Sequence, residues 1–128
     1  MCRLVTSIGI CLWLAGATAA HASPRVRTIL AGTTYAGLAT WDAALTVKCV
    51  QAKTCHEANP LLAPLVNRHG IKTAMTAKLA LNTAMTGGAI YVARKYPHRR
   101  KTITAMLMSM AAVQGYVVYR NYQVIQGR

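Results

Sequence analysis

The sequence contains no phenylalanine and only two acidic residues, Asp42 and Glu57, against fifteen lysines and arginines. Catalysis by an acid usually needs a second acid, a base or a nucleophile close by, and a solitary carboxylate has none. Charged residues make up 13% of the chain, whereas soluble domains carry about twice that share. These absences argue against an enzyme and favour a membrane protein over a soluble one.

Small and apolar residues dominate the composition. Hydrophobic residues make up 54% of the 128 residues, and alanine, threonine and methionine are frequent. Helices in lipid associate through small side chains, which let their backbones approach closely. The formal net charge of +13 draws the chain towards anionic phospholipid head groups or nucleic acid. Because the cations gather between apolar segments, we expect a lipid bilayer with anionic head groups as the partner and no nucleic acid.

Residues 1–22 have the features of a secretory signal peptide. One cation, Arg3, precedes an apolar run over residues 4–17, and Ala20-His21-Ala22 supplies the small residues of a cleavage site. We therefore predict cleavage before Ser23, which leaves residues 23–128 as a single helical membrane domain. The alternative, an uncleaved first membrane helix, is equally hydrophobic and stays open.

Three apolar segments follow, over residues 28–47, 71–93 and 102–119. Each has about 20 residues, the length with which a helix crosses roughly 30 Å of hydrocarbon. The period-two alternation that marks strands is missing. The predicted fold is all-α: a small transmembrane helical bundle of three apolar helices after the signal or signal-anchor segment.

The loop between the first two segments carries the motif Glu57-Ala58-Asn59-Pro60. Asparagine caps the free amides at the start of a helix, and proline fits the first helical position. We therefore predict a short interfacial helix after Asn59-Pro60, closed by Gly70. Glu57 is then near the positive end of that helix, where a carboxylate is favourable and can fasten the loop.

Two charges of opposite sign, Asp42 and Lys78, lie inside the first and second segments. A charge within a membrane segment costs about 2.5 to 3.5 kcal/mol and is usually paired or functional. Both lie at a similar distance from the intervening loop, roughly 9 Å and 10.5 Å along their helices, so an antiparallel hairpin brings them level. We predict an intramembrane ion pair that sets the register, with Thr46 and Asn82 as polar partners one turn away. An ion or proton site at Asp42 is the alternative.

Cys49 and Cys55 are the two cysteines that lie outside the leader. Their spacing allows a disulfide bond on the oxidising side of the membrane. A zinc site that adds His56 and His69 matches the spacing of no common zinc finger, and covalent haem attachment requires a shorter spacing between the cysteines. We expect the disulfide bond, no metal and no cofactor.

Several of these features occur together in a family that the chain resembles. They are an Asp and a Thr in the first helix, a Glu-x-Asn-Pro loop and a Lys in the second helix, here Asp42, Thr46, EANPLL at residues 57–62, and Lys78. A basic turn, RKYPHRRK, and a third apolar helix follow. The chain resembles this family of small, uncharacterised, multi-span bacterial membrane proteins, and departs from it by the leader and the cysteine pair. The resemblance implies the fold and no activity.

The orientation in the membrane stays open. The flanks at the two ends of the segments hold nearly equal numbers of lysines and arginines, so the positive-inside rule barely discriminates. The resemblance implies that the basic turn lies inside. We predict an integral protein of the bacterial inner (cytoplasmic) membrane that is non-enzymatic, structural or partner-binding, with lipid, other membrane proteins or a second copy as partners. A secreted, soluble, basic helical protein that binds anionic polymers is a further alternative.

Overall fold

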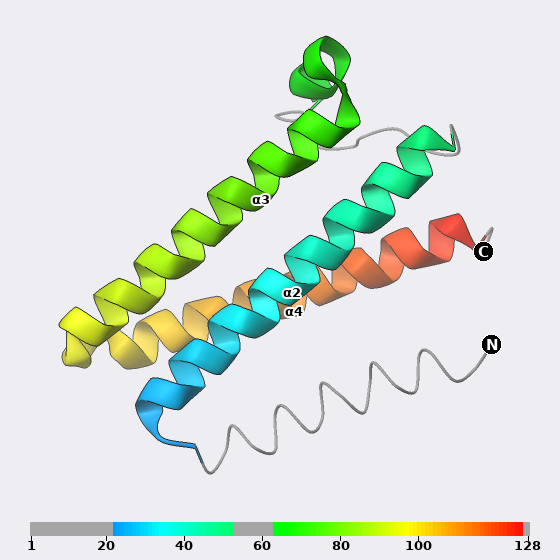
Figure 1. Ribbon diagram of the computed structural model, residues 1–128. Helices are drawn as coiled ribbons and strands as arrows, with labels where there is room; N and C mark the ends of the chain where they lie inside the picture. The colour runs from blue at the N-terminus through cyan, green and yellow to red at the C-terminus, as the bar shows by residue number, and fades with distance from the viewer. Residues whose placement is uncertain (1–21, 53–62, 127–128) are drawn as a thin grey trace.

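The computed structural model describes residues 22–52 and 63–126, and within these ranges the chain forms helices and no strands. The elements are α2 (Pro24–Gln51), α3 (Ala63–Lys95), a 3-10 turn η1 (Pro97–Arg99) and α4 (Arg100–Ile125) (Figure 1). The prediction of an all-α fold is confirmed for these residues. Several predictions fall outside the described residues. They concern residues 1–21 of the predicted leader, the loop motif Glu57, Asn59 and Pro60, and Cys55.

Helix α2 extends beyond the apolar segment 28–47 at both ends. At its start the side chain of Ser23 accepts a hydrogen bond of 3.5 Å from the amide of Val26, and Pro24 occupies the first turn, where the absence of an amide hydrogen costs nothing. Lys48 lies in the last turn, where a cation is favourable at the negative end of the helix dipole. The charged flanks that bound the apolar segment are thus themselves helical.

Helix α3 contains one break, at Gly70. The backbone there has φ +80° and ψ 160°, in the left-handed half of conformational space that only glycine enters at little cost. A short helix precedes Gly70 and a long one follows it, so the predicted helix end at this glycine is present. The predicted start of that short helix, at Asn59-Pro60, lies outside the described residues.

A tight turn joins α3 to α4. The Tyr96 amide donates to the Val92 carbonyl over 2.8 Å, and Pro97 opens the 3-10 turn that leads into α4. Arg100 Nε donates to the carbonyl oxygen of Ala93 over 3.2 Å, which holds the first residue of α4 against the end of α3. Such a short connection makes α3 and α4 run in opposite directions.

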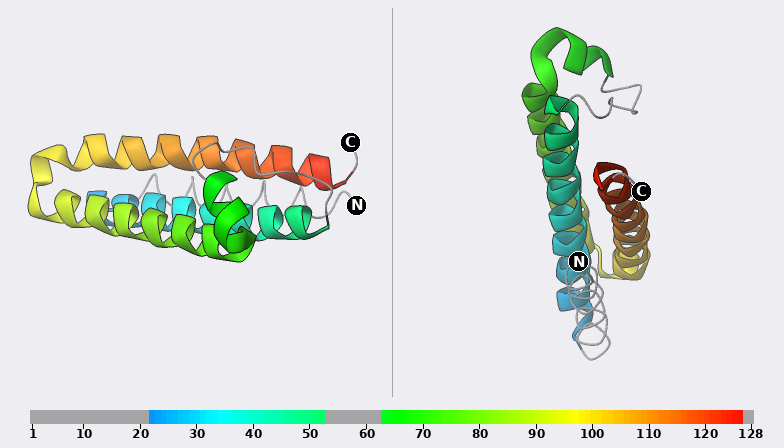
Figure 2. Two further views of the ribbon diagram at one scale, coloured as in Figure 1. Left: turned by 90° about the horizontal axis from the view of Figure 1, so that it is seen from above. Right: turned by 90° about the vertical axis from the view of Figure 1, so that its right-hand side faces the viewer.

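Helix α2 is the central element of the bundle. It lies antiparallel to α3, and α4 crosses both in a layer of its own (Figure 2). Contacts between α2 and each of the other helices are extensive, whereas α3 and α4 contact each other much less. The two outer helices are therefore held in place chiefly through α2.

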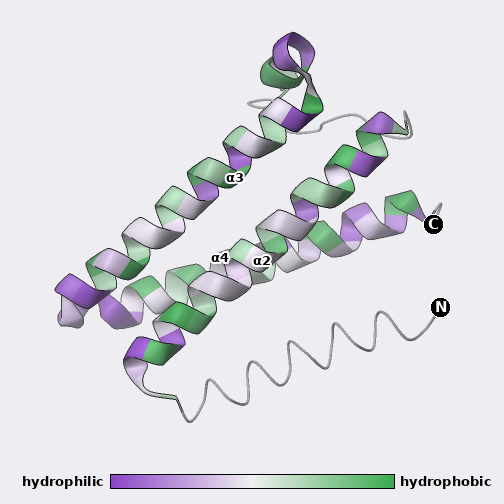
Figure 3. Ribbon diagram, in the orientation of Figure 1, coloured by the Kyte–Doolittle hydropathy of each residue, from purple (hydrophilic) through white to green (hydrophobic). Residues whose placement is uncertain are grey.

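The interior consists mainly of small side chains. The largest fully buried side chains are Leu107 and Asp42, one of which is charged. Most other buried apolar residues are alanines, which are Ala31, Ala39, Ala43, Ala74, Ala93 and Ala111. Large apolar side chains lie outside instead, among them Leu81, Met85, Tyr91, Met108, Val113 and Tyr116. Apolar positions recur along the whole length of all three helices (Figure 3).

Among the described helices, only the one over Pro97–Ile125 is long and apolar enough to cross a membrane, and little of that span is buried by the rest of the chain. The expectation of three such segments, 28–47, 71–93 and 102–119, is therefore not confirmed. Helix α2 falls short because threonines and Asp42 interrupt its apolar residues. Helix α3 falls short because it carries Lys72, Lys78 and several threonines.

Candidate functional site

Four buried side chains that carry polar or sulfur atoms lie at intervals of seven residues along α2: Thr28, Tyr35, Asp42 and Cys49. Seven residues make almost two helical turns, so residues at this spacing fall on nearly the same side of a helix. We refer to these four residues as the polar line of α2. They face the interior of a bundle whose other buried side chains are mostly alanine.

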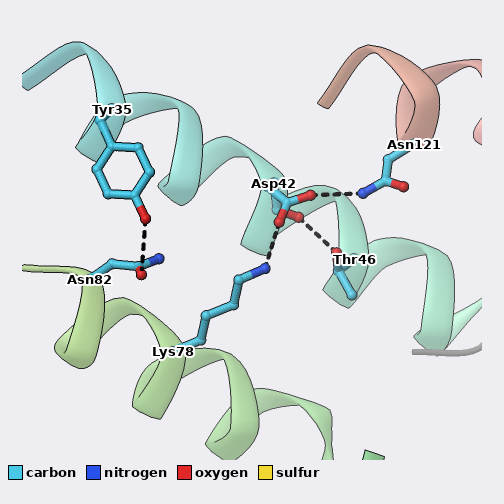
Figure 4. A network of polar contacts seen from close by, with 6 residues as sticks. All are labelled: Tyr35, Asp42, Thr46, Lys78, Asn82 and Asn121. Carbon is cyan, nitrogen blue, oxygen red and sulfur yellow. Dashed lines mark hydrogen bonds and ion pairs between the residues drawn. The ribbon is translucent and has the colours of Figure 1, made fainter. Parts of the chain in front are cut away.

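Asp42 forms the centre of the polar line. Its Oδ2 accepts a hydrogen bond of 2.6 Å from Nζ of Lys78 in α3, and its Oδ1 accepts one of 2.7 Å from Nδ2 of Asn121 in α4 (Figure 4). The residue is only 2% exposed. One carboxylate therefore joins all three helices, and both of its oxygens have a donor.

The pair between Asp42 and Lys78 removes the isolated charge from the interior. Transfer of a lone carboxylate out of water costs several kcal/mol, and an opposite charge in contact offsets much of that cost. The Lys78 side chain is 21% exposed, against 3% for that of Asp42, so its stem lies along apolar surface while part of it reaches the outside. The structure thus brings together the two charges that the sequence places level, and α2 and α3 are fixed in register by them.

The other predicted polar partners are nearby but contact different groups. Thr46 Oγ1 donates a hydrogen bond of 2.9 Å to the backbone carbonyl of Asp42, within the same helix, and not to its carboxylate. Asn82 was predicted as a polar partner of the ion pair. Instead, its Oδ1 accepts a hydrogen bond of 3.2 Å from the hydroxyl of Tyr35 (Figure 4). Asn82 therefore forms a second α2–α3 link, one turn of α3 away from the ion pair.

A third link joins α2 to α4 near the start of both helices. The hydroxyls of Thr28 and Thr104 lie 2.7 Å apart. Within its own helix, the hydroxyl of Thr28 also lies 3.1 Å from the carbonyl oxygen of Pro24, and that of Thr104 lies 2.9 Å from the carbonyl oxygen of Arg100. Along the polar line, Thr28 thus contacts α4, Tyr35 contacts α3, and Asp42 contacts both helices.

Sequence analysis did not identify Tyr35, Asn121 or the pair of Thr28 and Thr104. The signal was the seven-residue spacing of Thr28, Tyr35 and Asp42 within an apolar segment, which indicates one polar stripe facing partner helices. Asn121 was missed because it follows the predicted end of the third segment at residue 119.

Cys49 is disulfide-bonded. The predicted pairing with Cys55 stays a prediction, because Cys55 lies outside the described residues, and so does His56. Within residues 22–52 and 63–126, no three side chains of His, Cys, Asp or Glu gather as ligands for a metal ion. His69 lies exposed in the turn before Gly70.

Two buried polar atoms, Oγ1 of Thr86 and Nε2 of Gln114, have no hydrogen-bond partner in the structure. Thr86 lies on α3 beyond Asn82, and its Cγ2 is close to the position that a side chain on Gly32 would occupy. Other threonines of the described helices bond to a carbonyl one turn earlier, such as Thr40 to Ala36. The interior therefore also contains two polar atoms, on Thr86 and Gln114, that form no hydrogen bond with the polar line or with any other group.

Asp42 is the only acidic residue in the described part of the chain. Both of its oxygens already accept hydrogen bonds, from an ammonium and an amide. Such an arrangement can hold three helices in a fixed register.

The chain matches a known protein family over most of its length. Residues 33–126, which include Asp42, Lys78 and Asn121, match a family described as a domain of unknown function (DUF5658). The matched region spans most of the chain and all of α3 and α4. No curated protein and no solved structure matched.

Proposed function

The chain belongs to the DUF5658 family, and from that premise we propose that it is a small integral membrane protein with a structural or partner-binding role and no enzymatic activity. Its three described helices enter the bacterial inner membrane as one bundle. The observation that carries the proposal is the inverted polarity of that bundle: among the described residues the carboxylate of Asp42 is buried, whereas thirteen large apolar side chains are exposed and only four are buried.

The inverted polarity is unfavourable in water and favourable in lipid. Leu81, Tyr91, Val113 and Tyr116 are each 60 to 65% exposed, and large apolar side chains exposed together favour contact with a partner or with a membrane. A soluble bundle gains its stability by burying large apolar side chains, whereas this interior is built from alanine. Alanine interiors suit helices in lipid, where close packing replaces the hydrophobic drive.

Helices α2 and α3 can follow α4 into the bilayer because several of their polar groups are satisfied internally. Asp42 and Lys78 enter as an ion pair, which carries no net charge. The hydroxyls of Thr40, Thr46 and Thr76 each donate to a carbonyl of their own helix over 2.9 to 3.0 Å. A polar group satisfied in this way costs far less in hydrocarbon than a free one.

The two alternative functions are less well supported. A proton- or ion-handling site at Asp42 needs a carboxylate with access to a mobile partner, but both oxygens of Asp42 accept hydrogen bonds from Lys78 and Asn121. Unchanged proton flux through vesicles that carry Asp42→Asn would remove that alternative. A soluble protein that binds anionic polymers leaves the exposed apolar side chains of α3 and α4 without a role.

Flotation of washed membranes tests the proposal. Cells that express the full chain are broken, their membranes are washed with alkaline carbonate and concentrated salt, and the washed material is centrifuged upwards through a density gradient. We expect the protein to float with the lipid, because alkali and salt remove proteins held by charge alone. Recovery in the wash, or in a pellet that does not float, would contradict the proposal.

A further inference from the structure

The fold gathers most of the described cations at one end of the bundle, which we call the basic end. The start of α2 lies at the same end as the turn between α3 and α4 (Figure 1), and the Thr28–Thr104 contact of 2.7 Å joins their first turns. Seven lysines and arginines lie there, namely Arg25, Arg27, Arg94, Lys95, Arg99, Arg100 and Lys101. Hydrophilic residues mark this end on all three helices (Figure 3).

The opposite end differs in its chemistry. The described cations outside the basic end, apart from Lys78 in its ion pair, are Lys48, Arg68, Lys72 and Arg120. Cys49, near the end of α2, is disulfide-bonded there. Lys53 and Arg128 flank the same helix ends in the sequence but lie outside the described residues, so the number of charges does not distinguish the two ends; the cations of the basic end differ in that five of them fall within residues 94–101.

The cations of the basic end are positioned for contact with a charged surface. All except Arg100 are exposed, and the described part of this end contains no acidic residue that would neutralise them. Lys95 lies 5.7 Å from the ring centre of Tyr96, which itself meets His98 edge-on. Tyrosine and basic side chains are the residues that membrane proteins place at the level of the lipid head groups.

We propose that the basic end binds the anionic head groups of phospholipids and therefore lies at the cytosolic surface of the membrane. This rests on the proposed function, since it requires the bundle to be in a bilayer. Clusters of lysine and arginine next to membrane helices are attracted to anionic lipid, and such clusters remain on the cytosolic side during insertion. The disulfide bond at Cys49 independently favours an oxidising compartment for the other end.

This orientation has a consequence for the leader. Ser23 precedes α2 at the basic end, so it lies on the cytosolic side, whereas signal peptidase cuts on the outer side. The predicted cleavage before Ser23 is incompatible with the proposed orientation. An intact mass that begins at Ser23 would overturn the proposal.

Competition between lipids tests the proposed surface directly. The full-length protein in detergent is incubated with equal amounts of phosphatidylglycerol and phosphatidylcholine, and bound lipid is measured by native mass spectrometry. The variant Arg94→Gln/Arg99→Gln/Lys101→Gln removes three cations from the basic end. Its matched control, Arg68→Gln/Lys72→Gln/Arg120→Gln, removes three exposed cations from elsewhere, so both variants carry three fewer positive charges than the parent protein.

We expect the parent protein and the control to retain phosphatidylglycerol preferentially, and the basic-end variant to lose about tenfold or more of that preference. Equal loss in the two variants would show a general effect of charge and overturn the proposal, as would an unchanged basic-end variant. Helix content by circular dichroism shows whether each variant is folded. A protein that floats with membranes but prefers neither lipid removes this proposal and leaves the proposed function standing.

A reporter at the C-terminus tests the orientation. Helix α4 runs away from the basic end, so a fused alkaline phosphatase is expected outside, where it is active, and a fused green fluorescent protein is expected to be dark there. The opposite pattern would place the basic end outside and overturn the proposal.

Discussion

Asn121, near the end of α4, donates a hydrogen bond of 2.7 Å to Oδ1 of Asp42 in α2, across 79 residues of sequence. Lys78 of α3 occupies the other carboxylate oxygen at 2.6 Å. A single buried side chain thus contacts both outer helices, although these contact each other much less than either contacts α2. The relative placement of α3 and α4 therefore depends on α2 and on the contacts of Asp42.

The first prediction concerns the tether between α2 and α4. Asn121→Leu leaves Oδ1 of Asp42 buried without its donor, so we expect a loss of about 1 to 3 kcal/mol in the free energy of unfolding. Thermal unfolding in detergent, followed by circular dichroism, measures the loss. Gln123→Leu is the matched control, because the amide of Gln123 contacts only Tyr119 at an exposed position. Equal stability of the two variants would show that the contact of Asn121 does not hold α4.

The second prediction concerns the ion pair. Removal of one partner of a buried pair costs on the order of 3 to 5 kcal/mol, because the other charge is left buried. We expect Lys78→Ala to be worse than Asp42→Ala, since Lys78 is 21% exposed and its ammonium can move outwards when the carboxylate is absent. The double variant should lose less than the sum of the two single losses. Additive losses in this double-mutant cycle would contradict an energetic coupling between the two side chains.

The third prediction distinguishes lipid from water around α4. Val113 is 65% exposed, and a lysine at such a position changes stability by only about 0.5 kcal/mol if it faces water. If it faces lipid near the middle of the span, the cost rises to about 2.5 to 3.5 kcal/mol. We expect Val113→Lys to reduce the amount of folded protein in membranes strongly.

Thr102→Lys provides the control for that measurement, because it adds the same side chain at an exposed position beside Lys101. That variant should accumulate normally, and immunoblots of washed membranes compare the two. Normal accumulation of both variants would mean that the exposed face of α4 does not contact lipid.

The fourth prediction concerns a close approach of α2 and α3 at Gly32. A β-carbon added to Gly32 would lie 2.8 Å from Cδ1 of Ile90 and 3.1 Å from Cγ2 of Thr86. Gly32→Leu therefore forces the helices apart, and we expect a loss of about 1 to 3 kcal/mol. A β-carbon added to Gly37 would meet no atom within 4 Å, so Gly37→Leu should leave stability unchanged or raise it through better helix propensity. A loss of the same size at both glycines would disprove the close contact at Gly32.

Some of the site could be predicted by counting residues. Asp42 and Lys78 lie at similar distances from the loop that joins their helices, and a hairpin brings such positions level. The break at Gly70 was predictable as well, because glycine ends helices at a positive φ. The pairing of Asp42 with Lys78 and the break at Gly70 both follow from local rules, which act within one helix or between two helices joined by one loop.

The contact of Asn121 could not be predicted in the same way. It depends on how α4 crosses α2, and that crossing is set by small side chains such as Ala39 and Ala111 that fit many arrangements. Between the Thr28–Thr104 and Asp42–Asn121 contacts, α2 advances by fewer residues than α4 does, which is the result of that crossing. Segment length predicted three spans, whereas only Pro97–Ile125 among the described helices is apolar enough to be one, because polar and charged residues lower the mean hydropathy of α2 and α3.

The long separation along the chain between Asp42 and its two partners also means that they are synthesised at different times. Lys78 follows Asp42 by 36 residues and Asn121 follows it by 79. At a synthesis rate of about 5 to 20 residues per second, the carboxylate waits roughly 2 to 7 s for its ammonium and about 4 to 16 s for its amide. During that interval the nascent chain carries an unpaired negative charge, which favours keeping α2 near water until α3 emerges from the ribosome. If the bundle inserts into a membrane as proposed, Asp42 couples the insertion of the first described helix to the synthesis of the second.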